Sequence, residues 1–389
     1  MALLLKYRRS TKKSVPAFPS LSRRSNKGGK KFFRNLFLPA GFMLAIYAGA
    51  KHNRSIISDR TSKKDATQVE AMAMTAATVF EPPPSPLAID CSVFLESSSS
   101  PENVVHVAQA EHPFDMSLHD PKLEIISRAI KEKGCFECPI LNSLLSALKK
   151  LPQQASFIDI GGNIGMYSLY AASYGYNAVT FEPMKLNQER MCESIRLNTG
   201  FEDRVALIGA AMTDSSSTSK YVNFNTRGFK KYLVKRGDLN YGSGTVREIK
   251  SDNVPSGNRG VDYALSATVD SLQVTSHLPQ PGSRIVLKVD VEGFECKAIS
   301  GSLDYLSKVQ IEYAAIELGY VRMQECHQTE GDPLAKIFDL FVSKGLEQYL
   351  FSDGKWIKVD HVNWIGWARK RSVGLFDTAW SKEMPTFNL

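Results

Sequence analysis

Cysteine is scarce in this sequence, with six cysteines among 389 residues. A small scaffold held together by disulfides needs a far higher proportion. Only Cys135 and Cys138 lie close together, and no second pair at zinc-ligand spacing accompanies them. The pair is compatible with a redox motif, half of a zinc site or a local disulfide. We favour a structural or incidental role for it.

Acidic residues are missing from the start of the chain, where Asp59 is the first. Of the 48 lysine and arginine residues, 16 lie before Asp65, so the rest of the chain has 32 basic and 39 acidic residues. Nucleic-acid binding requires basic residues that cluster on a folded domain. Because the net charge of +8 comes from a tail, we expect no nucleic-acid partner.

Long apolar runs are also lacking, except for one from Asn35 to Ala50. Phe32 and Phe33 extend this run to a length that is short but sufficient for a thin bilayer. We therefore predict a signal-anchor over 32–50 behind a basic tail over 1–31, which the positive-inside rule keeps in the cytosol. The protein would be a single-pass type II membrane protein of the ER or Golgi with a lumenal domain.

The same start is compatible with a targeting presequence that is removed in an organelle, and residues 48–50 resemble a signal-peptidase site. The stretch 51–111 is rich in Ser, Pro, Ala and Thr, which predicts a flexible stem or linker. A folded domain over 112–389, with its core at 157–368, would follow. The hydrophobic content of 43% is sufficient for such a core.

From Pro121 onward, helical periodicity alternates with short β-rich runs, which is typical of βαβ units. We predict an α/β fold with a mostly parallel central sheet and helices on both faces. Several strands are too apolar to leave one face in water. The expected strands are 157–160, 178–181, 205–208, 285–289 and 314–316, and the expected helices are 122–133, 139–150, 164–174 and 185–198.

A glycine-containing turn, Asp159-Ile160-Gly161-Gly162-Asn163-Ile164-Gly165, follows the first strand. A pyrophosphate-binding fingerprint needs glycine at the first, third and sixth positions of such a turn. Counted from Gly161, the third and sixth positions are Asn163 and Met166, so the fingerprint is absent. Glycines at the first and fifth positions after a strand-end Asp suit S-adenosylmethionine, which has no phosphate and carries a positive sulfonium and ammonium.

Glu182 ends the next strand, 21 residues after Gly161. A carboxylate at this place can accept hydrogen bonds from both ribose hydroxyls. We therefore predict that the cofactor is bound by Asp159, Gly161, Asn163, Gly165 and Glu182. For Asn163, a role that only supports the turn is equally compatible. The structural alternative for the whole segment is a tight strand-to-helix turn.

Five segments together resemble the FkbM-type S-adenosylmethionine-dependent methyltransferases. They are FIDIGGNIG at 157–165, FEP at 181–183, TVDSL at 268–272, LKVDVEGFE at 287–295 and IE at 316–317. The resemblance extends over 157–368 and implies a Rossmann-like class I methyltransferase fold. It also implies O-methyl transfer to hydroxyls of sugars or polyketide-like molecules. The insertion 220–262, where acceptor loops lie in this family, is longer and more basic than usual.

Asp290 ends the fourth core strand, where a proton acceptor for the reacting hydroxyl is needed. Crowding by Glu292, Glu295 and Glu317 would strengthen this base. Alternatively, Asp290, Glu292 and Glu317 would hold a divalent cation that acidifies the hydroxyl. Glu295 is equally suited to cap the following helix. Lys288 would pair with Asp290 or Glu317, or contact the acceptor.

We therefore expect a methyltransferase that acts on a hydroxyl of a small molecule or glycan, with a sugar as the first choice because a lumenal enzyme meets glycans. Two alternatives come from other functional classes. One is a membrane-tethered, non-catalytic S-adenosylmethionine-binding module. The other is a nucleotide-sugar oxidoreductase on a related fold, which the missing fingerprint disfavours.

Overall fold

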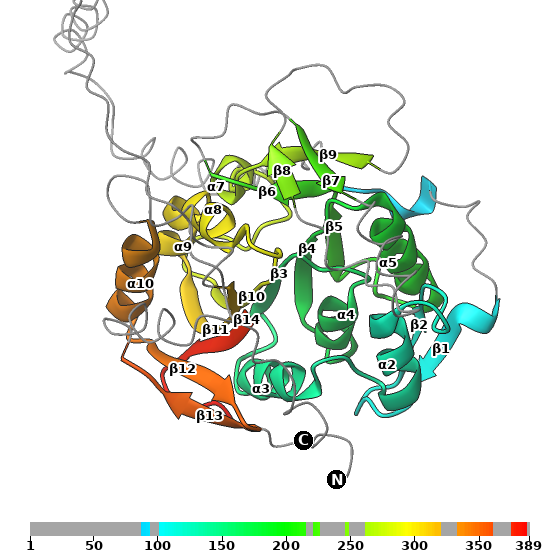
Figure 1. The fold of residues 1–389 in the computed structure, drawn as a ribbon, viewed down its shortest axis with the longest axis horizontal. Coiled ribbons are helices and arrows are strands. Elements are labelled where there is room, and N and C mark those ends of the chain that lie inside the picture. Colours follow the sequence, from blue (N-terminus) through cyan, green and yellow to red (C-terminus); the bar gives the residue numbers. More distant parts are fainter. Residues whose placement is uncertain are drawn as a thin grey trace, which may run out of the picture. The chain divides into compact units, whose positions relative to one another are not determined.

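The structure, a computed structural model, describes residues 87–93, 101–214, 221–225, 246–248, 261–319, 333–360 and 375–386. All of these residues belong to one compact unit, Val79–Leu389 (Figure 1). The predicted tail and signal-anchor lie outside the described residues, as does most of the insertion 220–262. Within the described part, no helix combines the length and the apolar character that crossing a bilayer requires.

The unit is built around an eight-stranded sheet (Figure 1). Its strands in chain order are β3 (Ser156–Ile160), β4 (Asn177–Phe181), β5 (Val205–Ile208), β10 (Arg284–Val289), β11 (Gln310–Gly319), β12 (Glu347–Ser352), β13 (Lys355–Lys358) and β14 (Leu375–Ser381). Their order across the sheet is β13-β12-β14-β11-β10-β3-β4-β5. The five strands from β11 to β5 are parallel, which confirms the predicted sheet.

The path of the chain through this sheet reverses once. From β3 it runs outward through β4 to β5, and it then returns to the other side of β3 and continues through β10 to β11. Two neighbouring strands, β3 and β10, therefore send their following loops in opposite directions, and a crevice opens between these loops. β14 pairs antiparallel with both β11 and β12, and β13 pairs antiparallel with β12.

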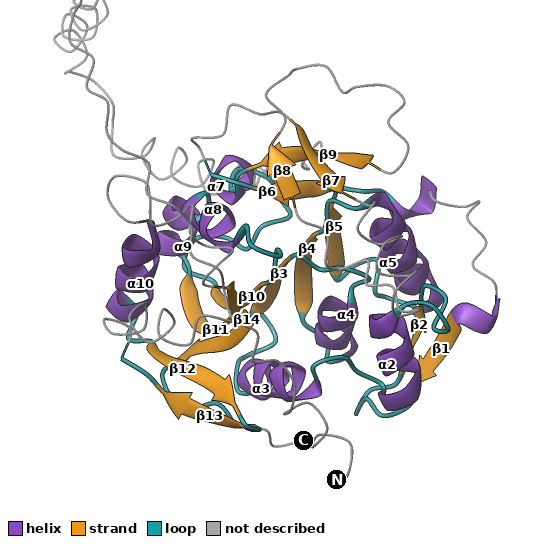
Figure 2. Ribbon diagram, viewed as in Figure 1, coloured by secondary structure: helices purple, strands orange, loops and turns teal. Residues whose placement is uncertain are grey.

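Helices cover both faces of the sheet (Figure 2). One face packs against α2 (Ile125–Lys133), α3 (Cys138–Lys149), α4 (Met166–Ser173) and α5 (Lys185–Leu197). The other face packs against α7 (Val269–Leu272), α8 (Glu295–Ser300), α9 (Leu303–Lys308) and α10 (Pro333–Ser343). Phe157 belongs to the first core and Ile158 to the second, because side chains alternate along a strand. Burial of both faces explains the apolar strands.

Local capping chemistry sets several helix boundaries. The carboxylate of Glu124 accepts the backbone N–H groups of Ile126 and Ser127 and so begins α2. Gly134, with φ of 77°, ends the same helix. Thr268 caps α7 by accepting the N–H of Ser271 at 3.0 Å. These side chains replace hydrogen bonds that helix ends otherwise lack.

Two smaller sheets flank the central one. Four strands, β6 (Ala210–Met212), β7 (Tyr221–Asn225), β8 (Val246–Glu248) and β9 (Val261–Ala267), pair in the order β6-β9-β7-β8. A separate hairpin joins β1 (Val104–Val107) and β2 (Phe114–Ser117). Short 3-10 helices, η1 (Cys91–Val93) and η2 (Pro101–Asn103), precede it. None of these elements was predicted from the sequence.

The predicted flexible linker extends too far towards the folded domain. Within 51–111, the segment 87–93 is attached to the edge strand β5, because Ile89 donates its N–H to Leu207 O at 2.8 Å and Gly209 donates to Leu87 O at 2.9 Å. A disulfide between Cys91 and Cys192 fixes the same segment to α5. Composition misled us because a segment that pairs through its backbone needs few large apolar side chains.

Candidate functional site

A cavity of about 310 Å³ lies where the loops after β3 and β10 diverge. Doubly wound α/β proteins bind their ligands at this switch point. The walls of the cavity come from the carboxyl ends of β3, β4, β10 and β11, from β6 and from the segment that precedes α3. The predicted cofactor and catalytic residues, with the exception of Asp159 and Gly165, line it.

Glycine shapes the turn after β3. Gly161 and Gly165 have left-handed φ values of 93° and 86°. A Cβ atom on Gly161 would lie 1.9 Å from the carbonyl oxygen of Asp290, so only glycine lets the two strand ends approach this closely. The N–H groups of Gly161 and Gly162 donate to Phe181 O at 2.9 and 3.1 Å. These amides hold the turn against β4, and a phosphate could not use them.

Glu182, at the end of β4, is buried and organises the turn. Its Oε2 atom accepts the N–H of Asn163 at 2.8 Å. Its Oε1 atom accepts the N–H of Met184 at 2.8 Å and the side-chain amide of Asn187 at 3.3 Å. Burial raises the pKa of Glu182 to about 7, although these hydrogen bonds oppose the shift. A carboxylate has about four acceptor sites, so room for a ribose hydroxyl remains.

Asn163 and Asp159 support the turn in different ways. Asn163 has φ of 51°, a conformation that asparagine tolerates better than most residues, and it lines the cavity. Asp159 is fully buried, and its Oδ2 atom accepts the hydroxyl of Ser168 at 3.0 Å. Burial raises the pKa of Asp159, although Lys288 lowers it. Asp159 therefore lies behind the turn and outside the cavity lining, and its predicted contact with the cofactor stays a prediction.

Lys288 is a cation inside an otherwise apolar strand. Its Nζ atom donates to Asp290 Oδ2 at 3.0 Å and lies 4.7 Å from the centroid of the Tyr167 ring. Burial lowers the pKa of Lys288, but the carboxylates of Asp290 and Asp159 outweigh burial and raise it. The amine therefore stays charged. Of the partners predicted for Lys288, the structure shows the pairing with Asp290.

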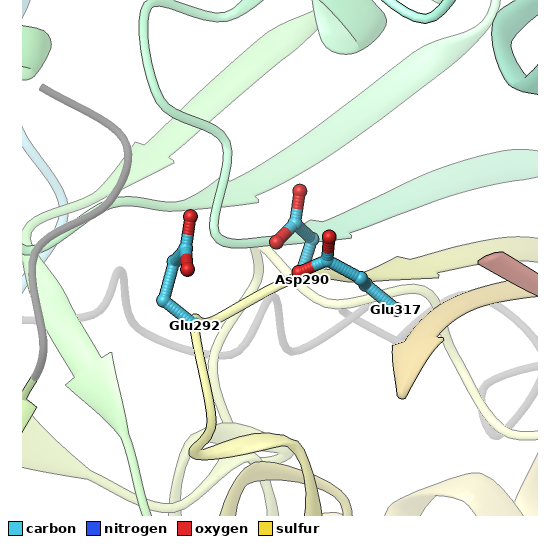
Figure 3. Close-up of side chains that lie close together, drawn as sticks. All are labelled: Asp290, Glu292 and Glu317. Atoms are coloured by element: carbon cyan, nitrogen blue, oxygen red, sulfur yellow. The ribbon is translucent and has the colours of Figure 1, made fainter. Parts of the chain in front are cut away.

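Asp290, Glu292 and Glu317 form a carboxylate cluster, in which one oxygen of each lies within 4.8 Å of the others (Figure 3). Burial, followed by the charges of Asp290 and Glu292, raises the pKa of Glu317 to about 9. Among the described residues, the buried Oε2 atom of Glu317 has no hydrogen-bond partner. Three carboxylates are a ligand set that Mg²⁺, Mn²⁺ or Ca²⁺ accepts, so the predicted cation site has its ligands together.

Two acidic residues of the sequence motifs serve the fold instead of the cavity. Glu295 is 1% exposed, and its Oε1 atom accepts the N–H groups of Val291 and Gly293 at 3.2 and 2.9 Å. Burial raises its pKa to about 7. Asp270, in the TVDSL segment, accepts the N–H of Tyr305 at 2.8 Å and so anchors α9. Glu295 thus holds the turn before α8, and no side chain caps that helix, so the structure shows a supporting role that differs from the predicted cap.

Sequence reasoning missed three residues of this region. Glu137 and Tyr167 line the cavity, and Asp377 of β14 pairs in register with Glu317. Burial raises the pKa of Asp377 to about 6, and Asp290 contributes to the shift. No motif marks Asp377 or Tyr167. The only signal for Glu137 was its position between Cys135 and Cys138, which we interpreted without reference to the site.

The comparison with protein families agrees with this geometry. Residues 159–342 match the model of the methyltransferase FkbM domain. The chain therefore contains a methyltransferase FkbM domain. A search of curated proteins returned no match.

Several solved structures are distantly similar to this chain. A TehB-like SAM-dependent methyltransferase from Corynebacterium glutamicum is 12% identical, with 66% of this chain and 94% of that chain covered and a TM-score of 0.32. A SAM-dependent methyltransferase from Agrobacterium tumefaciens is 10% identical, with 74% and 72% covered and a TM-score of 0.34. Pyrococcus horikoshii TYW2 in complex with MeSAdo is 12% identical, with 73% and 74% covered and a TM-score of 0.27.

S-adenosylmethionine is the cofactor of this family, and the residues of the cavity fit it. Glu182 offers acceptors for ribose hydroxyls at the β4 end. The carboxylate cluster at the β10 and β11 end complements a positive sulfonium and ammonium. Because three strand spacings separate β4 from β11, these two ends lie roughly 14 Å apart. The cavity therefore has a cofactor end and, beside the cluster, space for an acceptor.

Proposed function

We propose that this methyltransferase transfers the methyl group of S-adenosylmethionine to a hydroxyl group of a sugar. The observation that carries the proposal is the wall at the β10 and β11 end of the cavity. It holds the carboxyl groups of Glu137, Asp290, Glu292 and Glu317, and its ammonium group, Lys288, is paired with Asp290. Carboxyl oxygens accept hydrogen bonds, so a ligand with many hydroxyl donors complements this wall.

The same wall disfavours anionic acceptors. Phosphate groups are bound by arginine, by lysine or by backbone N–H groups at a helix end. Here the N–H groups of Gly161 and Gly162 are bonded to Phe181, and carboxylates surround Lys288. Repulsion by these carboxylates would weaken the binding of a phosphate-bearing acceptor. This argument favours neutral sugars over nucleic acids and nucleotide sugars.

Bound S-adenosylmethionine supplies an electrophilic methyl group. The protein orients the acceptor hydroxyl, which lowers the activation barrier by several kcal/mol. It also provides a group that receives the hydroxyl proton. Asp290 is fixed by Lys288 at 3.0 Å and keeps 29% of its side chain exposed, so it is free to bind the acceptor hydroxyl. A divalent cation on Asp290, Glu292 and Glu317 is the second way to activate that hydroxyl.

We also propose that the enzyme acts in the lumen of the secretory pathway as a type II membrane protein. The acid-free basic start and the apolar run 35–50 support this location. The disulfides Cys91–Cys192 and Cys135–Cys138 support it as well, because such bonds persist in oxidising compartments. Glycans are abundant acceptors there.

The experiment uses the full-length chain, labelled S-adenosylmethionine and a panel of p-nitrophenyl glycosides of mannose, galactose, glucose, xylose and fucose. We expect the wild-type chain to transfer label to a glycoside. Asp290→Asn should lose this transfer but keep cofactor binding in calorimetry. Asp353→Asn, at an exposed aspartate outside the cavity, is the control and should keep full activity. Label only on lipids or non-sugar hydroxyls would contradict the sugar acceptor. Cofactor binding without transfer to any acceptor would indicate a non-catalytic module. Tighter binding of NAD than of S-adenosylmethionine would indicate an oxidoreductase.

A chelator separates the two ways of activating the hydroxyl. If a divalent cation acts, EDTA abolishes transfer and Mg²⁺ or Mn²⁺ restores it. If a carboxylate acts alone, EDTA leaves the rate unchanged.

A further inference from the structure

Residues Cys135 to Cys138 form a short loop closed by a disulfide, with 5.4 Å between the two Cα atoms. The loop connects α2 to α3. Within it, Glu137 has φ of 49°, a left-handed backbone that a glutamate rarely adopts. Its carbonyl oxygen accepts the N–H groups of Ile140 and Leu141 at 2.9 and 3.2 Å, at the start of α3. The disulfide on one side and the helix on the other hold this conformation.

The loop directs Glu137 into the cavity. Phe136 and Glu137 both line the cavity wall, and the Tyr167 hydroxyl donates to Glu137 Oε2 at 3.4 Å. The ring of Tyr167 in turn contacts the ammonium group of Lys288, which binds Asp290. Glu137 is therefore the end of a connected row of polar groups that leads to Asp290. Glu137 comes from the loop before α3, and not from the parallel strands that carry Lys288 and Asp290.

The titratable groups that face Glu137 come from β14, from β10 and the loop after it, and from α4. Burial, followed by the charges of Asp377 of β14 and Asp290 after β10, raises the pKa of Glu137 to about 7. Lys288 of β10 and the hydroxyl of Tyr167 in α4 lower it. A carboxyl group with this pKa exchanges its proton near neutral pH, as an efficient general base must.

We propose that Glu137 is a catalytic residue that binds the acceptor hydroxyl and takes its proton during methyl transfer, in a position fixed by the Cys135–Cys138 disulfide. The proposal rests on the proposed function. The acceptor oxygen forms a bond to the methyl carbon, the bond from that carbon to sulfur breaks, and its electron pair stays on sulfur. The proton passes from the acceptor oxygen to the Glu137 carboxylate and then to solvent. Asp290, held by Lys288, orients the hydroxyl.

The first test compares Glu137→Gln with the wild-type chain on the glycoside that the wild type methylates fastest. General-base catalysis contributes roughly 10²- to 10⁴-fold, so we expect kcat to fall about 100-fold or more while cofactor affinity in calorimetry stays unchanged. The wild-type kcat/KM should rise through an apparent pKa of about 7, and the variant should lack this rise. Glu132→Gln, at an exposed glutamate of α2, is the matched control and should keep the wild-type kcat and the pH-dependent rise.

Three outcomes would overturn the proposal. They are an unchanged kcat in Glu137→Gln, a reduced kcat with the pH-dependent rise intact, and a parallel loss of cofactor binding. If Glu137→Gln does not fold, Glu137→Asp takes its place, because it keeps the charge but withdraws the carboxylate. Wild-type kcat in Glu137→Asp would also overturn the proposal. Absence of transfer by the wild-type chain would instead refute the proposed function, before any variant is compared.

The second test removes the disulfide that positions the carboxylate. In Cys135→Ser/Cys138→Ser we expect a higher KM for the glycoside and a lower kcat, with cofactor affinity retained. Cys91→Ser/Cys192→Ser removes the other described disulfide, which lies outside the cavity, and should leave the KM and the pH profile unchanged below its melting temperature. Wild-type KM and kcat in the Cys135/Cys138 variant would show that the disulfide does not position Glu137.

Discussion

At the scale of single residues, Glu137, Glu182 and Glu295 share a pKa that burial raises to about 7, but they meet different partners. Glu295 accepts two backbone N–H groups inside a turn, and Glu182 accepts two on the cavity wall. Glu137 meets a tyrosine hydroxyl inside the cavity. Burial sets the proton affinity of a carboxyl group, and the neighbouring donors decide whether it holds the backbone or faces a ligand.

Replacing Glu182 by Gln should weaken cofactor binding. One oxygen becomes an NH₂ group, which must then face the N–H of either Asn163 or Met184, so the turn loses a hydrogen bond to a charged acceptor. Such a bond contributes about 1.5–3 kcal/mol, and we expect the Kd for S-adenosylmethionine in calorimetry to rise about tenfold or more. Glu124→Gln makes the same change at the start of α2 and should leave this Kd unaltered. Equal Kd values for wild type and Glu182→Gln would contradict the assigned role.

Glu295 should make stability depend on pH. Its pKa is raised from 4.5 to about 7 by folding, so its contribution to the free energy of unfolding is present below pH 4.5 and is lost as pH rises through about 7. Glu295→Gln removes this loss. Because one pKa unit corresponds to about 1.4 kcal/mol, the variant should be more stable than wild type at pH 8 by on the order of 2 kcal/mol.

Urea unfolding at pH 5 and pH 8 measures this difference, and methyl transfer should be retained. Lys358 lowers the pKa of Glu347, so Glu347→Gln should leave the change between pH 5 and pH 8 as in wild type. Loss of transfer in a stable Glu295→Gln protein would favour the catalytic interpretation of this residue.

At the scale of elements, the close approach of β3 and β10 depends on one glycine. Gly161→Ala adds a Cβ atom 1.9 Å from the carbonyl oxygen of Asp290, so the strand ends must separate and Asp290 must move. We expect a stability loss of more than about 2 kcal/mol and loss of cofactor binding. Gly345→Ala has a similar φ of 77° but nothing within 4 Å, so only the strain of a left-handed alanine, about 1 kcal/mol, applies. Similar losses in both variants by urea unfolding would refute this account.

The parallel sheet and its helices could be predicted because their signals are local. Expected strand 157–160 and helix 185–198 agree with β3 and α5 to within one residue, since buried strands are apolar and helices are periodic. The turn after β3 and Glu182 were also predicted, because a short local motif is sufficient to indicate the residues at a strand end. Strands β6 to β9 were missed, since three- to seven-residue strands far apart in sequence leave no periodic signal.

Site residues from distant segments were missed for a related reason. Asp377 meets Glu317 only because β14 pairs with β11, a register that no local pattern encodes. Glu137 reaches the cavity through a left-handed backbone, which the sequence gives no reason to expect at a glutamate. Asp159 is fully buried and does not line the cavity, and its place in the motif does not encode this burial.

At the scale of the molecule, the folded unit begins before the region that matches the family. The family match starts at residue 159, yet β1, β2, α2 and α3 precede it, and the loop before α3 supplies part of the cavity wall. Residues 87–93 attach to the edge of the sheet through β5 and through the Cys91–Cys192 disulfide. An N-terminal segment of ordinary composition thus completes the domain.

The two described disulfides should contribute unequally to stability, because they close loops of very different length. Cys91–Cys192 joins residues 101 apart and Cys135–Cys138 residues 3 apart. Chain entropy lost from the unfolded state grows with loop length, which gives about 4–5 kcal/mol for the long loop and about 2 kcal/mol for the short one. We expect Cys91→Ser/Cys192→Ser to lower the free energy of unfolding by about 2–5 kcal/mol and Cys135→Ser/Cys138→Ser by less. Urea unfolding under oxidising conditions decides the order, and a reversed order would mean that the segment 87–93 is held by its backbone pairing with β5 alone.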